Sequence, residues 1–374
     1  MVCMRAVSVA LPIAREAKIE LLGLTFDELA AQARARLPRG AGLAPKVYKE
    51  AVLQARFEPE KMGLSAEAVQ AWRSTFQLTL PTVKESVEEP SHMGDDTMKV
   101  VLHFEDGLEV ECVRIPMGKD RYTLCVSSQV GCKMGCTFCE TAKMGFIRQL
   151  KASEIVAQLV VARSVLGWSI RNIVFMGMGE PLDNTEGVLQ ALRIMHDDHG
   201  LMYGQPRLTV CTAGRVDGLK ELAKLGYRRM DLSISLNAAF DHKRDQLMPV
   251  NRKFNLAELQ KTLVEYPRRK QFVYAINYCL LPDFNDTRED AAAVAAFVAP
   301  LGRAVVNVIP YNPGTIPLTR APTEQEVTTF LAWLKEDGCA VQRRVTKGRS
   351  VMAACGQLGN LELRKARLQK SAPS

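Results

Sequence analysis

The sequence lacks the marks of a membrane or secreted protein. None of its apolar stretches approaches the ~20 residues that a membrane-spanning helix needs. The opening segment, residues 1–18, is too short and too soon charged for a signal peptide. No internal repeat is visible. These absences predict a cytoplasmic protein with no membrane partner.

Histidine is also scarce: the chain has five, and none follows within fifty residues of Cys139. Cysteine is more abundant, with ten residues. Because the cytoplasm keeps thiols reduced, ten cysteines indicate metal binding or catalysis rather than a disulfide framework. An isolated buried cysteine usually acts as a small hydrophobic residue, and we interpret Cys3, Cys112, Cys279 and Cys339 in that way.

The 374 residues can form one large α/β domain and a smaller one, since domains usually contain about 50–250 residues. Hydrophobic residues make up 47%, which is enough for an ordinary globular core. The net charge of +8 is concentrated at the end of the chain, where eight basic residues from Arg343 onward face the single acidic Glu362. This basic tail fits a phosphate backbone as partner, or equally a solvated segment that aids solubility.

Three cysteines in the string GCKMGCTFC, namely Cys132, Cys136 and Cys139, form the most informative motif. The spacing CxxxCxxC can hold three corners of a [4Fe-4S] cluster and leave the fourth iron open for a second molecule. Zinc is the alternative. A structural zinc site needs four ligands, typically two cysteine pairs, and here one CxxC pair has one extra cysteine. Spacing alone leaves both metals open, and the neighbouring motifs favour the cluster.

Strand patterns alternate with helical patterns after the first hundred residues, as in a parallel sheet. The expected strands cover 122–127, 171–177, 207–212, 231–236, 272–280, 304–310 and 339–345. The expected helices cover 153–166, with a serine cap, 184–196, 214–225, 255–266, 286–298 and 323–337. These six βα units predict an α/β fold, a partial TIM-like barrel that does not fully close.

The pattern divides the chain into four segments. Residues 1–95 show amphipathic helical patterns without clear strands, which predicts a small helical accessory domain. Residues 96–120 alternate around an Asp-Gly turn and predict a β-hairpin that leads into the barrel. The barrel itself is expected over 121–345, and 346–374 form a C-terminal segment with the basic tail.

The GMGEP run, Gly177 to Pro181, directly follows an expected strand. Its glycines let the backbone approach a ligand, and Glu180 offers a carboxylate that can bind an ammonium group. An isolated run of this kind is more often an ordinary glycine turn, and the three-cysteine motif beside it favours the binding function. Ligands of parallel sheets bind at the C-terminal ends of strands, so we expect the cysteine loop, GMGEP and the YNP segment 311–313 to converge.

Together these motifs resemble the radical S-adenosylmethionine superfamily and, within it, the RlmN/Cfr family of RNA adenosine methyltransferases. The resemblance lies in RYTLCVSSQVGCKMGCTFC, FMGMGEPLDN, SISLNA, LMPVN, LPDFNDT, VNVIPYNP and ACGQL, over roughly 111–358. It implies a [4Fe-4S] cluster on the three cysteines and two S-adenosylmethionine molecules per turnover. It also implies that S-adenosylmethionine is contacted by Gly179, Glu180, Cys211, Ser235, Asn237 and Asn312.

The resemblance assigns catalytic roles to Cys355, Cys125 and Glu111. Cys355 matches the cysteine that is first methylated, and a radical made from a second S-adenosylmethionine then takes hydrogen from that methyl group. A radical route is required because an adenine ring carbon such as C2 is not nucleophilic enough to attack a sulfonium methyl. Glu111 would remove the ring proton. Cys125 would then attack sulfur, leaving a transient Cys125–Cys355 disulfide that cellular thiols reduce.

An ordinary structural explanation exists for four of the predicted site residues. Cys125 and Cys355 could be small buried hydrophobic residues, although both lie inside matched motifs. Glu111 could be a solvated strand residue, and Asn312 could be a turn residue.

Three residues depart from the family pattern. Asn237 stands where a histidine is usual, Cys211 where a serine is usual, and Glu140 where a small residue usually follows the last cluster cysteine. Asparagine can replace a histidine hydrogen bond, and cysteine is a weaker partner than serine, so cofactor binding would be altered rather than lost. These changes suggest a divergent paralogue.

The leading hypothesis is an RNA methyltransferase that modifies a ring carbon of adenosine, C2 rather than C8, in ribosomal or transfer RNA. C8 methylation is the nearest alternative. A non-catalytic RNA-binding protein with a structural metal site is the alternative from another class. The implied partners are RNA, an electron donor such as a flavodoxin-type reductant, and cellular thiols.

Overall fold

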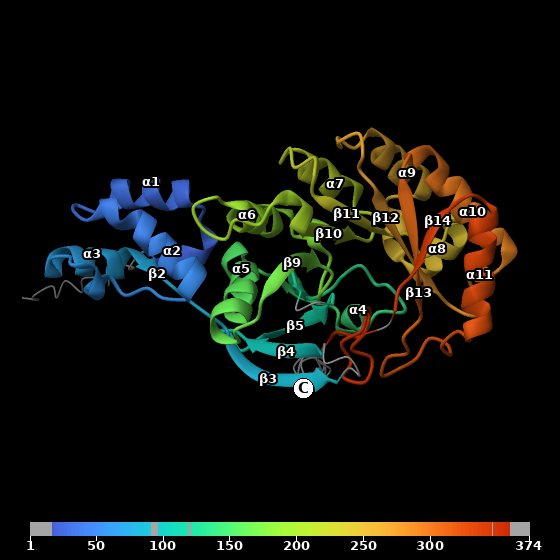
Figure 1. The fold of residues 1–374 in the computed structure, drawn as a ribbon, viewed down its shortest axis with the longest axis horizontal. Coiled ribbons are helices and arrows are strands. Elements are labelled where there is room, and N and C mark those ends of the chain that lie inside the picture. Colours follow the sequence, from blue (N-terminus) through green and yellow to red (C-terminus); the bar gives the residue numbers. More distant parts are fainter. Residues whose placement is uncertain (1–16, 91–95, 119–120, 346, 360–374) are drawn as a thin grey trace, which may run out of the picture.

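The computed structural model describes residues 17–90, 96–118, 121–345 and 347–359. A ten-stranded sheet forms its centre, in the order β14-β13-β12-β11-β10-β9-β6-β5-β4-β3 (Figure 1). The first seven of these pair in parallel. The parallel strands in chain order are β6 (Tyr122–Cys125), β9 (Ile170–Phe175), β10 (Leu208–Thr212), β11 (Asp231–Ser235), β12 (Tyr274–Leu280), β13 (Ala304–Pro310) and β14 (Ala340–Arg343).

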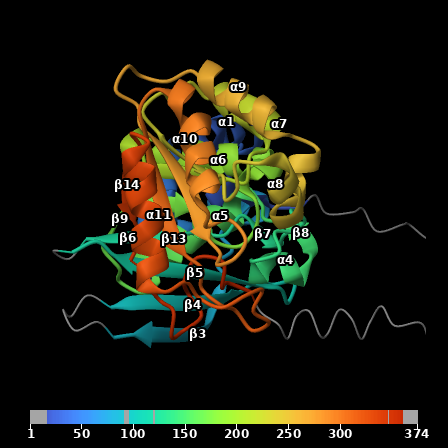
Figure 2. The ribbon, with the colours of Figure 1, turned by 90° about the vertical axis from the view of Figure 1, so that its right-hand side faces the viewer.

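Each connection between these strands contains a helix on the outside of the sheet (Figure 2). The main helices are α5 (Ala152–Val160), α6 (Thr185–His196), α7 (Val216–Ala223), α9 (Leu256–Glu265), α10 (Arg288–Val298) and α11 (Glu324–Glu336). Two short helices, α4 (Glu140–Met144) and α8 (Asp241–Leu247), lie in the longer connections. The alternation gives the six predicted βα units.

Local side-chain chemistry fixes where these helices begin. Thr323 caps α11 with a capping box that includes Glu326, as a Thr-x-x-Glu sequence favours. The predicted serine cap of α5 is wrong. Ser153 lies inside the helix, because Glu154 accepts a hydrogen bond from the backbone N–H of Lys151 at 2.7 Å and starts the helix earlier.

The barrel is partial, as predicted. Among the described residues, β14 pairs only with β13, and β3 (Thr82–Glu89) pairs only with β4 (Thr97–His103). The chain that follows β14 crosses towards the β3 edge. There Glu89 accepts hydrogen bonds from the backbone N–H groups of Gly348 and, at 2.9 Å, Ser350. A connecting segment therefore spans the opening that the sheet leaves.

The predicted hairpin is present as β4 and β5 (Glu109–Pro116), but it belongs to a three-stranded antiparallel extension. The prediction that residues 1–95 lack strands is wrong, because β3 lies there, as do the two-residue strands β1 (Ile19–Glu20) and β2 (Phe76–Gln77). The run TVKESVEE is rich in charge because β3 is an edge strand, where charged side chains discourage pairing with another molecule.

The accessory helices are α1 (Phe26–Arg36), α2 (Ala44–Gln54) and α3 (Ala66–Thr75). Of these, α2 packs against α5, and the short 3-10 helix Leu21–Gly23 contacts both α5 and α6 (Figure 1). Asp197, just after α6, accepts hydrogen bonds from the backbone N–H of Phe26 at 2.7 Å and from the Tyr48 hydroxyl at 3.1 Å. These bonds attach the accessory helices to the barrel.

Two parts of the sequence predictions lie outside the described residues. They are Cys3 and the basic residues Arg364, Lys365, Arg367 and Lys370. Within the described ranges, no helix combines the length and apolar character needed to cross a bilayer.

Candidate active site

A cavity of about 660 Å³ opens at the C-terminal ends of the parallel strands and extends along their inner side to Arg207 and Asp231. Its lining includes residues from all three expected motifs: Cys132 from the cysteine loop, Glu180 from GMGEP and Tyr311 from YNP. The predicted convergence is therefore observed. The volume lies within the range of about 300–1,000 Å³ that is usual for small-molecule sites.

Ten of the twelve predicted site residues line this cavity. They are Cys125, Cys132, Cys136, Cys139, Gly179, Glu180, Cys211, Ser235, Asn237 and Cys355. Glu111 and Asn312 are buried but are not among the lining residues. The structure thus places most of the predicted residues around one space, and their chemical roles remain predictions.

The cysteine loop runs from β7 (Gln129–Gly131) to α4, and its shape depends on close backbone packing. Gly131 has φ of +75°, and a Cβ there would lie 1.9 Å from the carbonyl oxygen of Gly145. Only glycine fits this position. The N–H of Cys132 donates to the same oxygen at 3.1 Å, and the N–H of Cys139 donates to Cys136 at 3.1 Å. The strand β8 (Phe146–Gln149) then pairs with β7.

Burial makes the three loop thiols reluctant to ionise without a partner. It raises the pKa of Cys132 to about 12 and raises that of Cys136 well above its ordinary value, and charge on Cys139 adds to both effects. In the part of the chain that the structure describes, no three ligand side chains form a ready-made ion site. Three thiols on one loop around one cavity are nevertheless the donor set of an iron–sulfur cluster, which is bound by thiolates. Cys132, Cys136 and Cys139 fit that group.

Glu180 is a buried carboxylate held by three protein donors. It accepts from the Thr212 hydroxyl at 2.7 Å, from the N–H of Ala213 at 2.8 Å and from the N–H of Leu182 at 3.1 Å. Burial nevertheless raises its pKa to about 7. Because a carboxylate offers about four acceptor positions, one remains for a ligand. The side chain lines the cavity, so a cationic donor there would favour its ionised form.

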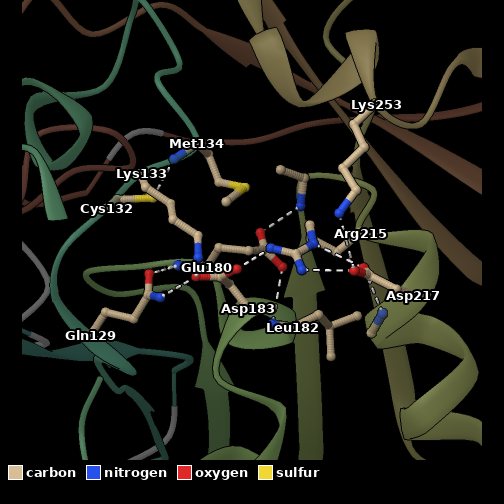
Figure 3. A network of polar contacts seen from close by, with 12 residues as sticks. Gln129, Cys132, Lys133, Met134, Glu180, Leu182, Asp183, Arg215, Asp217 and Lys253 are labelled. Carbon is tan, nitrogen blue, oxygen red and sulfur yellow. Dashed lines mark hydrogen bonds and ion pairs between the residues drawn. The ribbon is translucent and has the colours of Figure 1, made fainter. Parts of the chain in front are cut away.

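A network of charges beside Glu180 was not predicted from the sequence (Figure 3). Asp183 pairs with Lys133, in the cysteine loop, at 3.0 Å and with Arg215, and it accepts from Gln129 at 2.9 Å. Although burial acts to raise the pKa of the Asp183 carboxyl, Lys133 and Arg215 hold it below its ordinary value. The network fixes the cysteine loop to the GMGEP segment. Two sequence features could have indicated this network: Asp183 at the end of GMGEPLD, and Lys133 between Cys132 and Cys136.

Cys355 lies on the segment that crosses from β14 towards β3. It is exposed, whereas Cys125, at the end of β6, is buried. Burial raises the pKa of Cys125, and both side chains line the same cavity. All nine described cysteines are free thiols. The arrangement offers one accessible thiol and one protected thiol at the same cavity.

Glu111 bonds to the Cys355 segment. Its carboxylate pairs with Lys99 at 3.1 Å and accepts from the N–H of Gly359 at 2.7 Å. Glu111 is not among the residues that line the cavity, and its role as a base stays a prediction. Asn312 follows Tyr311, whose hydroxyl accepts the N–H of Leu318 at 3.0 Å.

Comparisons with known proteins agree with this site. The family profile described as "Radical SAM superfamily" matches residues 126–295. The chain is 42% identical over 269 residues to a protein of Protochlamydia amoebophila described as "Probable dual-specificity RNA methyltransferase RlmN 1", covering 72% of this chain and 75% of that relative. The chain belongs to the RlmN family of radical S-adenosylmethionine RNA methyltransferases.

Two further similar proteins match about nine tenths of this chain. A dual-specificity RNA methyltransferase RlmN of Campylobacter fetus is 36% identical over 355 residues, which is 90% of this chain and 97% of the relative. The crystal structure of a radical SAM methyltransferase from Sphaerobacter thermophilus has a TM-score of 0.81 and 32% identity, covering 91% of this chain and 99% of that one. The fold and the family therefore agree.

Asn237 and Cys211, the two cofactor-site residues that the sequence analysis set apart from the family pattern, both line the cavity. Asn237 has φ of +57°, which asparagine tolerates, and its side-chain oxygen accepts the N–H of Cys279 at 2.9 Å. The Cys211 sulfur lies 3.6 Å from both the Ser235 hydroxyl and the Asn277 amide, and burial raises its pKa to about 11. Asn237 is thus well held, while Cys211 makes only weak polar contacts.

Proposed function

We propose that this protein methylates a ring carbon of adenosine, C2 rather than C8, in ribosomal or transfer RNA. One observation carries the proposal: exposed Cys355 and buried Cys125 line the same cavity as the three cluster cysteines. The relatives described as dual-specificity RNA methyltransferases support RNA as the substrate. Asn237 and Cys211 support assignment to a divergent paralogue within the family.

The cofactor space lies between the cysteine loop and the strand ends. Cys132, Cys136 and Cys139 would hold the [4Fe-4S] cluster, which when bound supplies the electron that cleaves S-adenosylmethionine. Glu180 would accept the ammonium group of S-adenosylmethionine at its free acceptor position. Gly179 allows close approach, because its φ of +97° and its contact with Gln129 leave no room for a side chain. Two S-adenosylmethionine molecules would be used per methyl group transferred.

The remaining steps fall to the chain's own side chains. Cys355 would first accept a methyl group on its accessible sulfur. That methyl group would give one hydrogen atom to the cleaved S-adenosylmethionine, and its carbon would then bond to the adenine ring carbon. Glu111, whose carboxylate has acceptor positions beyond those that Lys99 and Gly359 use, would take the ring proton as the ring loses one electron, which balances the electron used for cleavage. The Cys125 thiolate would then attack the Cys355 sulfur. This step breaks the bond between that sulfur and the new methyl carbon, which takes up a proton, and it leaves a disulfide between the two cysteines.

Two electrons from cellular thiols would reduce the disulfide back to two free thiols. A flavodoxin-type reductant would supply electrons to the cluster. Such thiols are abundant in the cytoplasm, which we propose as the location.

Nucleoside analysis tests the proposal. RNA incubated anaerobically with loaded protein, S-adenosylmethionine and a reductant is digested and examined by mass spectrometry. We expect 2-methyladenosine, and we expect Cys355→Ala to form none while it still cleaves S-adenosylmethionine. Detection of 8-methyladenosine instead would show that the methylated ring carbon is C8 and not C2. Absence of any methyladenosine in both RNA classes, with the cluster loaded, would overturn the proposal.

A further inference from the structure

A buried carboxylate, Glu140, joins the cysteine loop to the segment that carries Cys355. Glu140 is the first residue of α4 and directly follows Cys139. Its side chain is only 3% exposed. Its backbone N–H donates to the carbonyl oxygen of Gly356 at 2.8 Å, so the helix start contacts the residue next to Cys355.

The Glu140 side chain also fixes a third segment, the loop after β13. One carboxylate oxygen accepts from the Thr315 hydroxyl at 2.6 Å, and the other pairs with Lys143 at 2.6 Å. Lys143 in turn donates to the carbonyl oxygen of Ile316 at 2.6 Å. A Cβ on Gly314 would lie 2.1 Å from a carboxylate oxygen of Glu140, so this loop packs directly against the carboxylate.

The loop after β13 is itself attached to the Cys355 segment. The Gln357 side chain donates to the carbonyl oxygen of Pro313 at 3.0 Å and accepts from the N–H of Ala354 at 3.3 Å. Thr141, next to Glu140, donates to the carbonyl oxygen of Leu358 at 2.5 Å. Two routes therefore connect Glu140 to the Cys355 segment: the α4 backbone and the loop after β13.

We propose that Glu140 is a positioning residue that holds Cys355 at a fixed place above the cysteine loop before RNA binds. Glu140 does not line the cavity, so it acts through Thr315, Lys143 and Gly356 rather than on the reacting atoms. The catalytic meaning of this position rests on the proposed function. The positioning itself is a property of the protein without RNA.

The competing explanation is purely local. An acidic residue in the first turn of a helix stabilises that helix by itself, and Glu140 with Lys143 forms an ordinary pair three residues apart. In that case only α4 would respond to substitution. The contacts with Thr315 and Gly356 predict instead that two distant segments respond.

Site-resolved hydrogen exchange on the full-length, cluster-loaded protein distinguishes the two explanations. In Glu140→Ala we expect amide exchange in residues 354–359 and 314–316 to accelerate about tenfold, as loss of a charge-assisted hydrogen bond implies. Glu140→Gln keeps an acceptor for Thr315 and should give a smaller increase. Faster exchange confined to residues 140–144 would overturn the proposal.

The chain offers a matched control. Glu221 and Lys224 on α7 form a pair with the same spacing, at 2.7 Å, but Glu221 is 47% exposed. Glu221→Gln should leave exchange in 354–359 unchanged. If Glu140→Ala fails to fold, Thr315→Val removes one partner alone, and it should still accelerate exchange in 354–359. Unchanged exchange there in Thr315→Val and Glu140→Gln would count against positioning.

A kinetic measurement connects the positioning to methyl transfer. If the proposed function holds, Glu140→Gln should lower kcat and leave the KM for RNA unchanged, because the RNA contacts are intact. If the proposed function fails, no methyl transfer will be seen in either protein, while the exchange result still decides whether Glu140 positions Cys355.

Discussion

The two sulfur-bearing segments of the site are held in different ways. In the cysteine loop, backbone groups bond mainly to one another, as when Cys132 donates to Gly145 and Cys139 donates to Cys136. The Cys355 segment is held mainly by side chains from elsewhere, among them those of Glu89 and Glu111. The cysteine loop is thus shaped mainly by contacts within its own segment, with a side-chain link from Lys133 to Asp183. The segment that carries Cys355 is placed mainly by long-range contacts.

The sharpest test of the first half of this comparison is Cys136→Ser. We expect loss of essentially all bound iron after anaerobic reconstitution, since the thiolate is the cluster ligand. Iron analysis and visible absorbance would report this loss. Cys279→Ser is the control, because Cys279 lines the same cavity but lies outside the loop. Equal iron loss in both variants would mean that the loop is not the sole ligand set.

The next largest effect concerns the Cys355 segment. Cys125→Ala should stop the reaction within a single turnover and trap RNA covalently on Cys355, because no thiolate remains to free the product. A denaturing gel with labelled RNA would show the adduct. Cys112→Ala, which removes a buried thiol outside the cavity, should turn over normally. If Cys125→Ala released free product at the normal rate, Cys125 would not be the residue that frees the product from Cys355.

A smaller effect separates the two segments. Asp183→Asn removes the counter-ion of Lys133 and one of the two counter-ions of Arg215, and we expect about tenfold faster cluster loss with unchanged exchange in residues 354–359. Asp217→Asn is the control. Asp217 pairs with the same Arg215 but is 44% exposed, so its removal should change little. Faster exchange at 354–359 in Asp183→Asn would show that the segments are not independent.

The mildest effect is a dependence on pH. Burial raises the pKa of Glu180 to about 7, so its contribution to folding is present below about 4.5 and is lost as pH rises through about 7. An ammonium ligand binds the ionised form, so affinity for S-adenosylmethionine should rise several-fold between pH of about 5.5 and 7. Equilibrium binding to the loaded protein measures this, and Glu180→Gln should flatten the profile.

The fold and the gathering of the sequence motifs around one cavity could be predicted because they depend on local patterns. Strands such as β12 and helices such as α10 alternate with clear periodicity, and parallel strands place their C-terminal ends on one side. β3 was missed because TVKESVEE buries little and carries the charges of an edge strand. The regular alternation of apolar and polar residues that predicts a strand is therefore weak in β3.

Long-range polar contacts were beyond the sequence patterns. Lys133 and Asp183 belong to different motifs, and no spacing rule indicates that their side chains meet. The position of Glu111 also depends on tertiary structure, since Lys99 and Gly359 turn its carboxylate towards the Cys355 segment. Sequence motifs identified which residues gather at the site, and the folded chain decides which way each of them faces.

The bridge from β14 to Glu89 on β3 has a consequence for biosynthesis. A ribosome makes the cysteine loop and nearly all of the barrel before it reaches Cys355, and the residues that anchor this cysteine come from both ends of the sheet. A chain that ended before residue 347 would lack the segment that spans the opening between β14 and β3. Its cavity would then lose the part of its lining that Ala353, Ala354 and Cys355 supply.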